Sequence, residues 1–245
     1  MIRVRNLALA LVFGAVMMAL VSACSESSEP LVTNDVVTGI PWGQTEVATY
    51  RVTQNDIEGE CVLTIEEDGG DVTLSQACEG AGFTDSVSVD ADAETLAPVS
   101  TERTITGPEG EVNCRAEYGE AGVNVRWVSP GDERENDLAV PRPAYDSWGD
   151  LFLWRTVRFG QGYDQNYVDV ATCTNPRARP ELVGVRLTAT GIETVEAPYG
   201  TFETWRLRVR SEGHTQDVWY SSDEERLLVK YDNGEQVFEL VSLER

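Results

Sequence analysis

Apolar and polar residues alternate with a period of two along most of this chain, as in strands that bury one face. Turn signals such as Gly69-Gly70 and Asn233-Gly234 separate the alternating segments. The pattern predicts an all-β domain over residues 42–245, a mainly antiparallel curved sheet of half-barrel or sandwich-like form. The predicted strands lie near residues 46–53, 61–66, 72–78, 83–89, 95–105, 111–118, 122–128, 163–173, 182–195, 201–211, 215–221, 226–232 and 235–243.

The first of these turns fixes a strand register. Gly69-Gly70 suits the positive φ angles of a two-residue hairpin turn. Counting outward from that turn sets Ile65 opposite Leu74 and Cys61 directly opposite Cys78. In a non-hydrogen-bonded antiparallel pair the Cα atoms lie about 4.5 Å apart, within reach of a disulfide. We therefore predict a Cys61–Cys78 disulfide.

A second two-residue turn is predicted at Asn233-Gly234, the strongest hairpin dipeptide in the chain. It pairs Val229 with Phe238 and gives both flanking strands one apolar face.

Three arginines share one face of the strand predicted over residues 201–211: Arg206, Arg208 and Arg210. Asp217, on the next strand, is expected opposite Arg208 or Arg210. A face of this kind could bind an anion, but salt bridging among so many acids is the favoured interpretation.

Residues 129–147 interrupt the alternation with a loop rich in Pro, Asp and Glu. One short helix is predicted after it, with Asp146 or Ser147 as N-cap and with helical spacing of Trp148, Leu151, Phe152 and Arg155. The helix is expected to cover an open end or face of the sheet. For Trp148 and Trp154, packing is favoured over lining a pocket mouth.

The N-terminus has the three parts of a secretory signal peptide: Arg3 and Arg5, an apolar run from Leu7 to Val21, and a small-residue ending before Cys24. The run has 15 residues, shorter than the roughly 20 that span a bilayer as a helix. The ending resembles a lipobox, which implies cleavage after residue 23 and lipidation of Cys24. An ordinary signal peptide or an uncleaved anchor is the alternative.

The predicted domains are therefore a signal peptide over residues 1–23, a lipidated Cys24 with a flexible tether to residue 41, and one β domain from residue 42. The stretch after Cys24 is polar and suits a tether. Two or three acyl chains make a stable membrane anchor. The location predicted is the bacterial cell envelope, on the extracytoplasmic side.

With Cys24 lipidated, four cysteines remain, which in an exported protein favours two disulfides. Cys114–Cys173 then follows by elimination once Cys61 pairs with Cys78. A zinc site is the alternative, but there is no C-x-x-C pair and only one histidine, His214. No metal and no cofactor are predicted.

Removing residues 1–23 removes two arginines and no acids, which leaves 17 basic and 42 acidic side chains, a formal charge of −25. Such a surface is repelled by phosphate backbones, so a nucleic-acid partner is not expected.

We find no catalytic motif of a known hydrolase class in the sequence, and His214 lies at a turn between two strands. The segment from Asp90 to Glu94 begins like a calcium loop but lacks the later glycine and acid, so only weak surface binding of calcium stays open. A pair of carboxylates of the glycosidase type also stays open, because 42 acids offer many pairs.

The C-terminal half resembles the family called domain of unknown function 3108. The resemblance rests on the run from Gly191 to Thr204, on Val218-Trp219-Tyr220-Ser221 and on Leu228-Val229-Lys230-Tyr231, with weaker matches at Thr95–Val99 and Tyr145–Arg155. It implies an exported protein with a curved antiparallel sheet, and it supplies no catalytic residues. Such a sheet is reminiscent of envelope carriers that hold acyl chains in a half-barrel, an analogy of fold alone.

Taken together, the sequence predicts a non-enzymatic, membrane-anchored lipoprotein that binds an apolar ligand or a partner protein in the envelope. An extracytoplasmic hydrolase with paired carboxylates, or a purely structural envelope protein, is the alternative.

Overall fold

The computed structural model describes residues 31–245 with the exception of 56, 81 and 109. The predicted signal peptide, the lipidation site Cys24 and the first part of the tether lie outside the described residues. Within the described part of the chain, no helix has the length and apolar character needed to cross a membrane.

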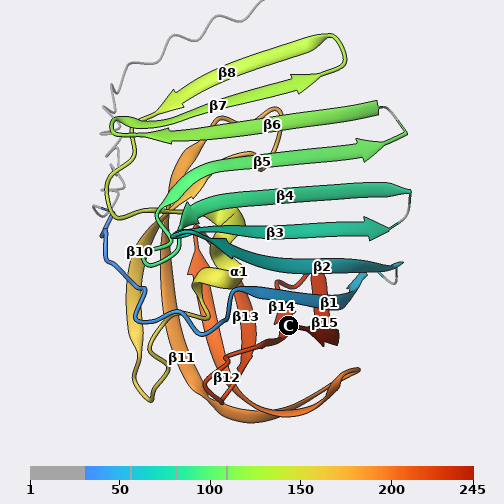
Figure 1. The fold of residues 1–245 in the computed structure, drawn as a ribbon, viewed down its shortest axis with the longest axis vertical. Coiled ribbons are helices and arrows are strands. Elements are labelled where there is room, and N and C mark those ends of the chain that lie inside the picture. Colours follow the sequence, from blue (N-terminus) through green and yellow to red (C-terminus); the bar gives the residue numbers. More distant parts are fainter. Residues whose placement is uncertain (1–30, 56, 81, 109) are drawn as a thin grey trace, which may run out of the picture. The chain divides into compact units, whose positions relative to one another are not determined.

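Fifteen strands form a single sheet in the order β8-β7-β6-β5-β4-β3-β2-β1-β15-β14-β13-β12-β11-β10-β9 (Figure 1). Neighbouring strands are antiparallel, apart from β9 and β10, which are parallel. The first and the last strand of the chain, β1 and β15, pair with each other inside the sheet. The strands are β1 (Thr45–Gln54), β2 (Ile57–Asp68), β3 (Asp71–Gly80), β4 (Phe83–Asp92), β5 (Pro98–Gly107), β6 (Gly110–Gly119), β7 (Gly122–Ser129), β8 (Asp132–Leu138), β9 (Tyr145–Asp146), β10 (Asp164–Ala171), β11 (Glu181–Ala197), β12 (Gly200–Ser211), β13 (His214–Ser221), β14 (Leu228–Asp232) and β15 (Gln236–Glu244).

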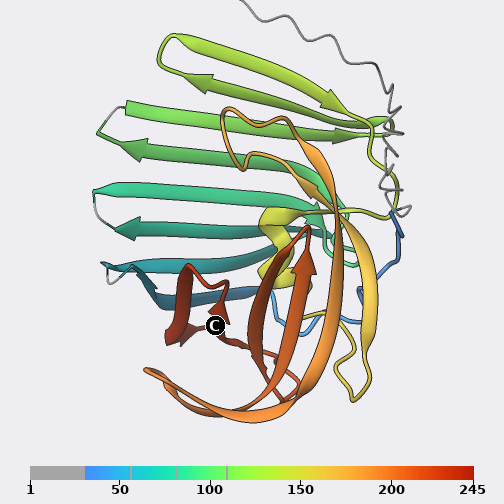
Figure 2. The ribbon, with the colours of Figure 1, turned by 180° about the vertical axis from the view of Figure 1, so that it is seen from behind.

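The sheet bends so that its two halves share one core, with a short helical segment between them (Figures 1 and 2). The main apolar cluster combines Ile65 and Leu74 of the first half with Leu207 and Leu240 of the second, and Leu153 of the helix lies in the same cluster. All-β architecture with one short helix is therefore confirmed.

A second apolar cluster holds the end of the sheet in place. Val168 and Val170 of β10 pack against Ala116 of β6 and against Val125 and Trp127 of β7. The Cys114–Cys173 disulfide, with Cα atoms 5.6 Å apart, joins β6 to the segment after β10 at the same place. Strand β10 is thus fastened to the inner face of the opposite half of the sheet.

The β2–β3 hairpin has the register expected from its glycine turn. Asp68 pairs with Asp71, and Cys61 pairs with Cys78 and forms a disulfide with it. Gly69 and Gly70 take φ angles of 63° and 103°, which a side chain would disfavour.

The register predicted for the β14–β15 hairpin is wrong by two residues. Tyr231, rather than Val229, pairs with Phe238. The reason is the Asn233 side chain, whose Oδ1 accepts hydrogen bonds from the backbone N–H groups of Glu235 and Gln236 and closes a four-residue loop. A shift of two residues keeps the same faces buried.

The loop predicted over residues 129–147 contains strand β8, which is a correction. Six of its seven residues have charged or amide side chains, with no alternation of apolar and polar positions, because β8 is the edge of the sheet and exposes both faces. Its register against β7 is supported by an ion pair of Arg126 with Glu133, at 2.8 Å between Nη2 and Oε1.

The helical segment begins as predicted. A 3-10 turn, η1 (Ser147–Gly149), precedes α1 (Asp150–Leu153), and the carboxylate of Asp146 accepts a hydrogen bond from the backbone N–H of Trp148 at 3.0 Å. Asp146 is therefore the N-cap.

The predicted tether differs from the structure in its second half. From residue 31 the chain belongs to the same compact unit as the sheet. Val36 is buried, and the backbone N–H of Thr38 donates to the Thr156 carbonyl oxygen at 3.0 Å. The cause is the apolar content of this stretch, which the sheet covers.

Candidate functional site

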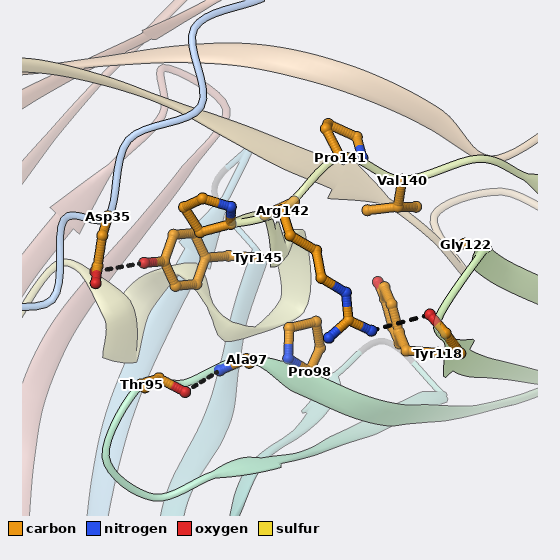
Figure 3. A pocket seen from close by; sticks show the side chains of 13 residues that line it. Asp35, Thr95, Ala97, Pro98, Tyr118, Gly122, Val140, Pro141, Arg142 and Tyr145 are labelled. Atoms are coloured by element: carbon orange, nitrogen blue, oxygen red, sulfur yellow. Dashed lines mark hydrogen bonds between the residues drawn. The ribbon is translucent and has the colours of Figure 1, made fainter.

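A pocket of about 400 Å³ lies where β5, β6 and β7 meet the segment that leads into β9; we call it the outer pocket (Figure 3). Its walls are mostly apolar and include three prolines. The lining comprises Asp35, Thr95, Ala97, Pro98, Tyr118, Gly119, Gly122, Val140, Pro141, Arg142, Pro143, Ala144 and Tyr145.

One basic side chain points across the outer pocket (Figure 3). The Arg142 guanidinium donates from Nη2 to the Gly119 carbonyl oxygen at 2.9 Å. Arg142 is exposed, and it forms no ion pair with any residue that the structure describes. The guanidinium therefore keeps N–H groups that can pair with an anionic group of a ligand.

The opposite wall of the outer pocket is fixed by the buried ring of Tyr145. Its hydroxyl donates to the Asp35 carboxylate at 2.9 Å, and the backbone N–H of Val36 donates to the same hydroxyl at 3.4 Å. Burial raises the pKa of the Tyr145 hydroxyl, and its hydrogen bond to Asp35 raises that pKa further. The pocket thus has a neutral aromatic wall that holds the N-terminal segment.

A second space, the inner cleft, lies between the two halves of the sheet. It consists of a deep part of about 320 Å³ and a mouth of about 480 Å³. Both parts are lined by Gln76, Trp148, Gln236 and Phe238, so they adjoin.

Three aspartates surround the helical segment beside the inner cleft. Asp146 accepts hydrogen bonds from hydroxyl groups of both halves of the sheet: Thr101 at 2.8 Å, Thr172 at 2.6 Å, and Tyr118. Burial raises the pKa of Asp146, and these hydrogen bonds oppose the rise. Asp146 thus joins β5, β6 and the end of β10.

The other two aspartates, Asp150 of α1 and Asp169 of β10, both line the deep part of the inner cleft. Burial, with the charge of Asp146 adding to it, raises the pKa of Asp150 to about 8, and the Tyr167 hydroxyl, which donates to Asp150 at 2.6 Å, opposes that rise. Burial and the charges of Asp150 and Asp146 raise the pKa of Asp169 well above its usual range. The pair of aspartates therefore holds a proton at neutral pH.

The residues singled out from the sequence lie at different places. Trp154 is buried and donates from its indole N–H to the Tyr167 hydroxyl at 2.9 Å, whereas Trp148 lines the inner cleft. His214 is exposed at the start of β13. Asp92 closes a turn by accepting hydrogen bonds from the backbone and hydroxyl of Thr95.

Two of the three arginines on this face of β12 form salt bridges with Asp217, as favoured from the sequence. Asp217 pairs with Arg208 in the sheet register and contacts it at 2.9 Å, and Arg206 contacts the same carboxylate at 2.5 Å.

The outer pocket and the aspartate pair were not found from the sequence. One signal for the pair does exist: Asp169 interrupts the apolar run Tyr167-Val168-Asp169-Val170, and all four residues are buried. A charged residue inside a strand that is buried on both faces is uncommon and indicates a special role. No comparable signal marks Arg142.

Comparison with known proteins places the chain in a family. Residues 35–241 match the family described as "Protein of unknown function (DUF3108)". The comparison with curated proteins gives no match.

Two solved structures are similar. One is a β-barrel-like protein of domain of unknown function DUF1849 from Brucella abortus, with 10% identity and a TM-score of 0.52, covering 82% of this chain and 97% of that one. The other is a protein with a YmcC-like fold from Bacteroides fragilis, with 11% identity and a TM-score of 0.28, covering 88% of this chain and 99% of that one. The first similarity shows a shared fold and carries no statement about activity.

Proposed function

This chain belongs to the DUF3108 family, and we propose that it is a lipid-anchored extracytoplasmic protein that binds an amphiphilic ligand in the outer pocket without transforming it. The ligand class is an apolar chain or ring with one acidic group. The mostly apolar, concave outer pocket with a single basic side chain is the observation that carries the proposal.

The apolar walls favour such a ligand because binding removes apolar surface from water on both partners. Arg142 adds specificity, since a guanidinium pairs with a carboxylate or phosphate through two parallel hydrogen bonds. The chain as a whole is strongly acidic and repels an acidic ligand. A basic group inside the pocket offsets that repulsion locally.

The extracytoplasmic location is supported by the two disulfides, which persist in oxidising compartments. The lipid anchor is proposed from the lipobox-like ending at Cys24. Eleven peptide units separate Cys24 from Asp35 at the pocket, a reach of at most about 40 Å. An anchored protein would therefore keep the outer pocket within reach of the membrane, the natural source of amphiphiles.

The electrostatics of the aspartate pair favour binding over hydrolysis. Burial raises the pKa of both Asp150 and Asp169, whereas a glycosidase keeps one carboxyl of its pair ionised as nucleophile or base.

The test uses a fluorescent fatty acid, 11-(dansylamino)undecanoic acid, with the purified protein. We expect saturable binding, at least a tenfold loss of affinity in Ala97→Phe, which fills the outer pocket, and a smaller loss in Arg142→Gln. Val99→Phe is the matched control, because Val99 lies two residues away but is exposed outside the pocket. Equal affinities for Ala97→Phe and Val99→Phe would refute the proposal.

A further inference from the structure

The deep part of the inner cleft has a chemistry different from that of the outer pocket. Aromatic side chains line it on several sides, among them Trp148 of η1, Tyr231 of β14 and Phe238 of β15. The lining also contains Asp150 and Asp169, and it contains no Lys or Arg among the described residues. Aromatic faces together with carboxylates are the surroundings that proteins use for organic cations.

The acidic side chains at the mouth of the inner cleft also favour a cation. Glu58, Glu60 and Glu79 lie at the mouth. The one arginine there, Arg103, is held by Asp85 at 2.5 Å and by the Cys173 carbonyl oxygen at 2.7 Å. Arg51, which lies near these glutamates, is paired with Glu239, so a cation entering the cleft meets acidic groups.

The molecule already places one cation against this wall. The Arg103 guanidinium lies 4.3 Å from the centre of the Trp148 ring. This contact shows that the aromatic lining of the cleft accepts a cation on its face.

The aspartate pair supplies the observation that points to a ligand. Asp169 is 5% exposed and lines the deep part of the cleft, and its Oδ1 accepts no hydrogen bond from an N–H or O–H group of the described residues. Asp150, its partner, is only half-buried. An ammonium N–H would supply the hydrogen bond that this buried oxygen lacks.

We propose that the deep part of the inner cleft binds a primary organic ammonium ion. Its nitrogen would donate to the unpartnered Oδ1 of Asp169, beside Asp150, and its apolar body would lie against Trp148, Tyr231 and Phe238. The proton balance closes: the ammonium enters with its three N–H bonds intact, and a proton held by the aspartate pair leaves to solvent as that carboxyl ionises.

Other titratable groups near the pair do not supply the counter-charge. They are one carboxyl group and four tyrosine hydroxyls, contributed by β6, β9, β10, β13 and β14: Tyr118, Asp146, Tyr167, Tyr220 and Tyr231. Burial raises the pKa of each of these tyrosines, which keeps them neutral, so none of these described groups supplies a positive charge at the pair.

The test is titration calorimetry of the purified protein at pH 7 with 2-phenylethylammonium chloride, and with 2-phenylethanol as the neutral analogue. Repeating it in buffers of different ionisation enthalpy counts released protons. We expect saturable binding of the ammonium with release of close to one proton, and at least tenfold weaker binding of the alcohol. Similar affinities for the two compounds, or no binding of the ammonium, would overturn the proposal.

Variants locate the binding. Asp150→Asn and Asp169→Asn should each weaken ammonium binding at least tenfold, whereas Asp137→Asn, at an exposed acid of β8, should change it less than twofold. Ser211→Phe fills the deep part of the cleft while both aspartates are retained, and it should also abolish binding. It therefore tests the site even if the aspartate variants do not fold. Unchanged affinity in Ser211→Phe would place the ammonium elsewhere. Ala97→Phe, in the outer pocket, should have no effect.

Discussion

The guanidinium of Arg155 and the carboxylate of Glu46, 109 residues apart, form a buried ion pair with 2.7 Å between Nη1 and Oε1. Arg155 follows the short helix, and Glu46 lies in β1. Arg155 also donates to the carbonyl oxygens of Glu225 and Arg226. One side chain thus connects the helical segment to the strand that joins the two halves of the sheet.

Breaking this pair should destabilise the domain strongly. Glu46→Gln leaves a buried guanidinium without its counter-charge, which costs about 3–5 kcal/mol in free energy of unfolding. The matched control is Glu239→Gln, which breaks the more exposed pair of Arg51 and Glu239 and should cost less than about 1 kcal/mol. Urea unfolding measures both, and equal losses would contradict the structural role of the buried pair.

The stability of the domain should fall as pH rises towards 9. The pKa of Asp150 is about 8 in the folded protein and about 4 in the unfolded chain. The folded state therefore holds more protons between these values, and its stability is lost as pH rises through the folded pKa. Between pH 5 and pH 9 we expect a loss of more than about 2 kcal/mol.

The double variant Asp150→Asn/Asp169→Asn tests this assignment, because amides do not titrate in that range. It should remove most of the pH dependence, and Asp137→Asn should leave it unchanged. Urea unfolding at pH 5, 7 and 9 compares the three proteins. A double variant with the pH slope of the natural protein would show that the slope has another origin.

The two disulfides should contribute unequally. They close loops of 17 and 59 residues, for which loop-closure entropy gives about 3 and about 4 kcal/mol. The double substitution of Cys114 and Cys173 by serine should therefore cost more stability than that of Cys61 and Cys78. The reverse order in urea unfolding would contradict the role of Cys114–Cys173 in fastening β10 to β6.

Lipidation predicts a clear change on fractionation. Cys24→Ser removes the side chain that we propose is acylated, so the protein should move from the membrane fraction to the soluble extracytoplasmic fraction and lose labelling by palmitate. Ser25→Ala is the matched control and should stay with the membrane. Membrane association of Cys24→Ser at the natural level would argue against the anchor.

Much of the sheet could be predicted because its information is local. Alternation fixes which face of a strand is buried, and Gly69-Gly70 admits one turn and so one register for Cys61 and Cys78. The β14–β15 register was missed because the Asn233 side chain stabilises a longer loop. Strand β8 was missed because an edge strand exposed on both faces has no alternation to detect.

The sites depend on contacts between distant segments, which no local pattern encodes. Asp150 and Asp169 come together because β10 returns beneath the helical segment, and Arg142 enters the outer pocket because the chain crosses the ends of β5, β6 and β7. In a chain with 42 acids, sequence alone could not select this pair.

Native mass spectrometry of the protein purified from its host cells tests the proposed ligand binding most directly. We expect the native mass of the natural protein and of Val99→Phe to exceed the denatured mass by one amphiphile, and the native mass of Ala97→Phe to show no such excess. An equal excess in Ala97→Phe, or none in any of the three proteins, would contradict ligand binding in the outer pocket.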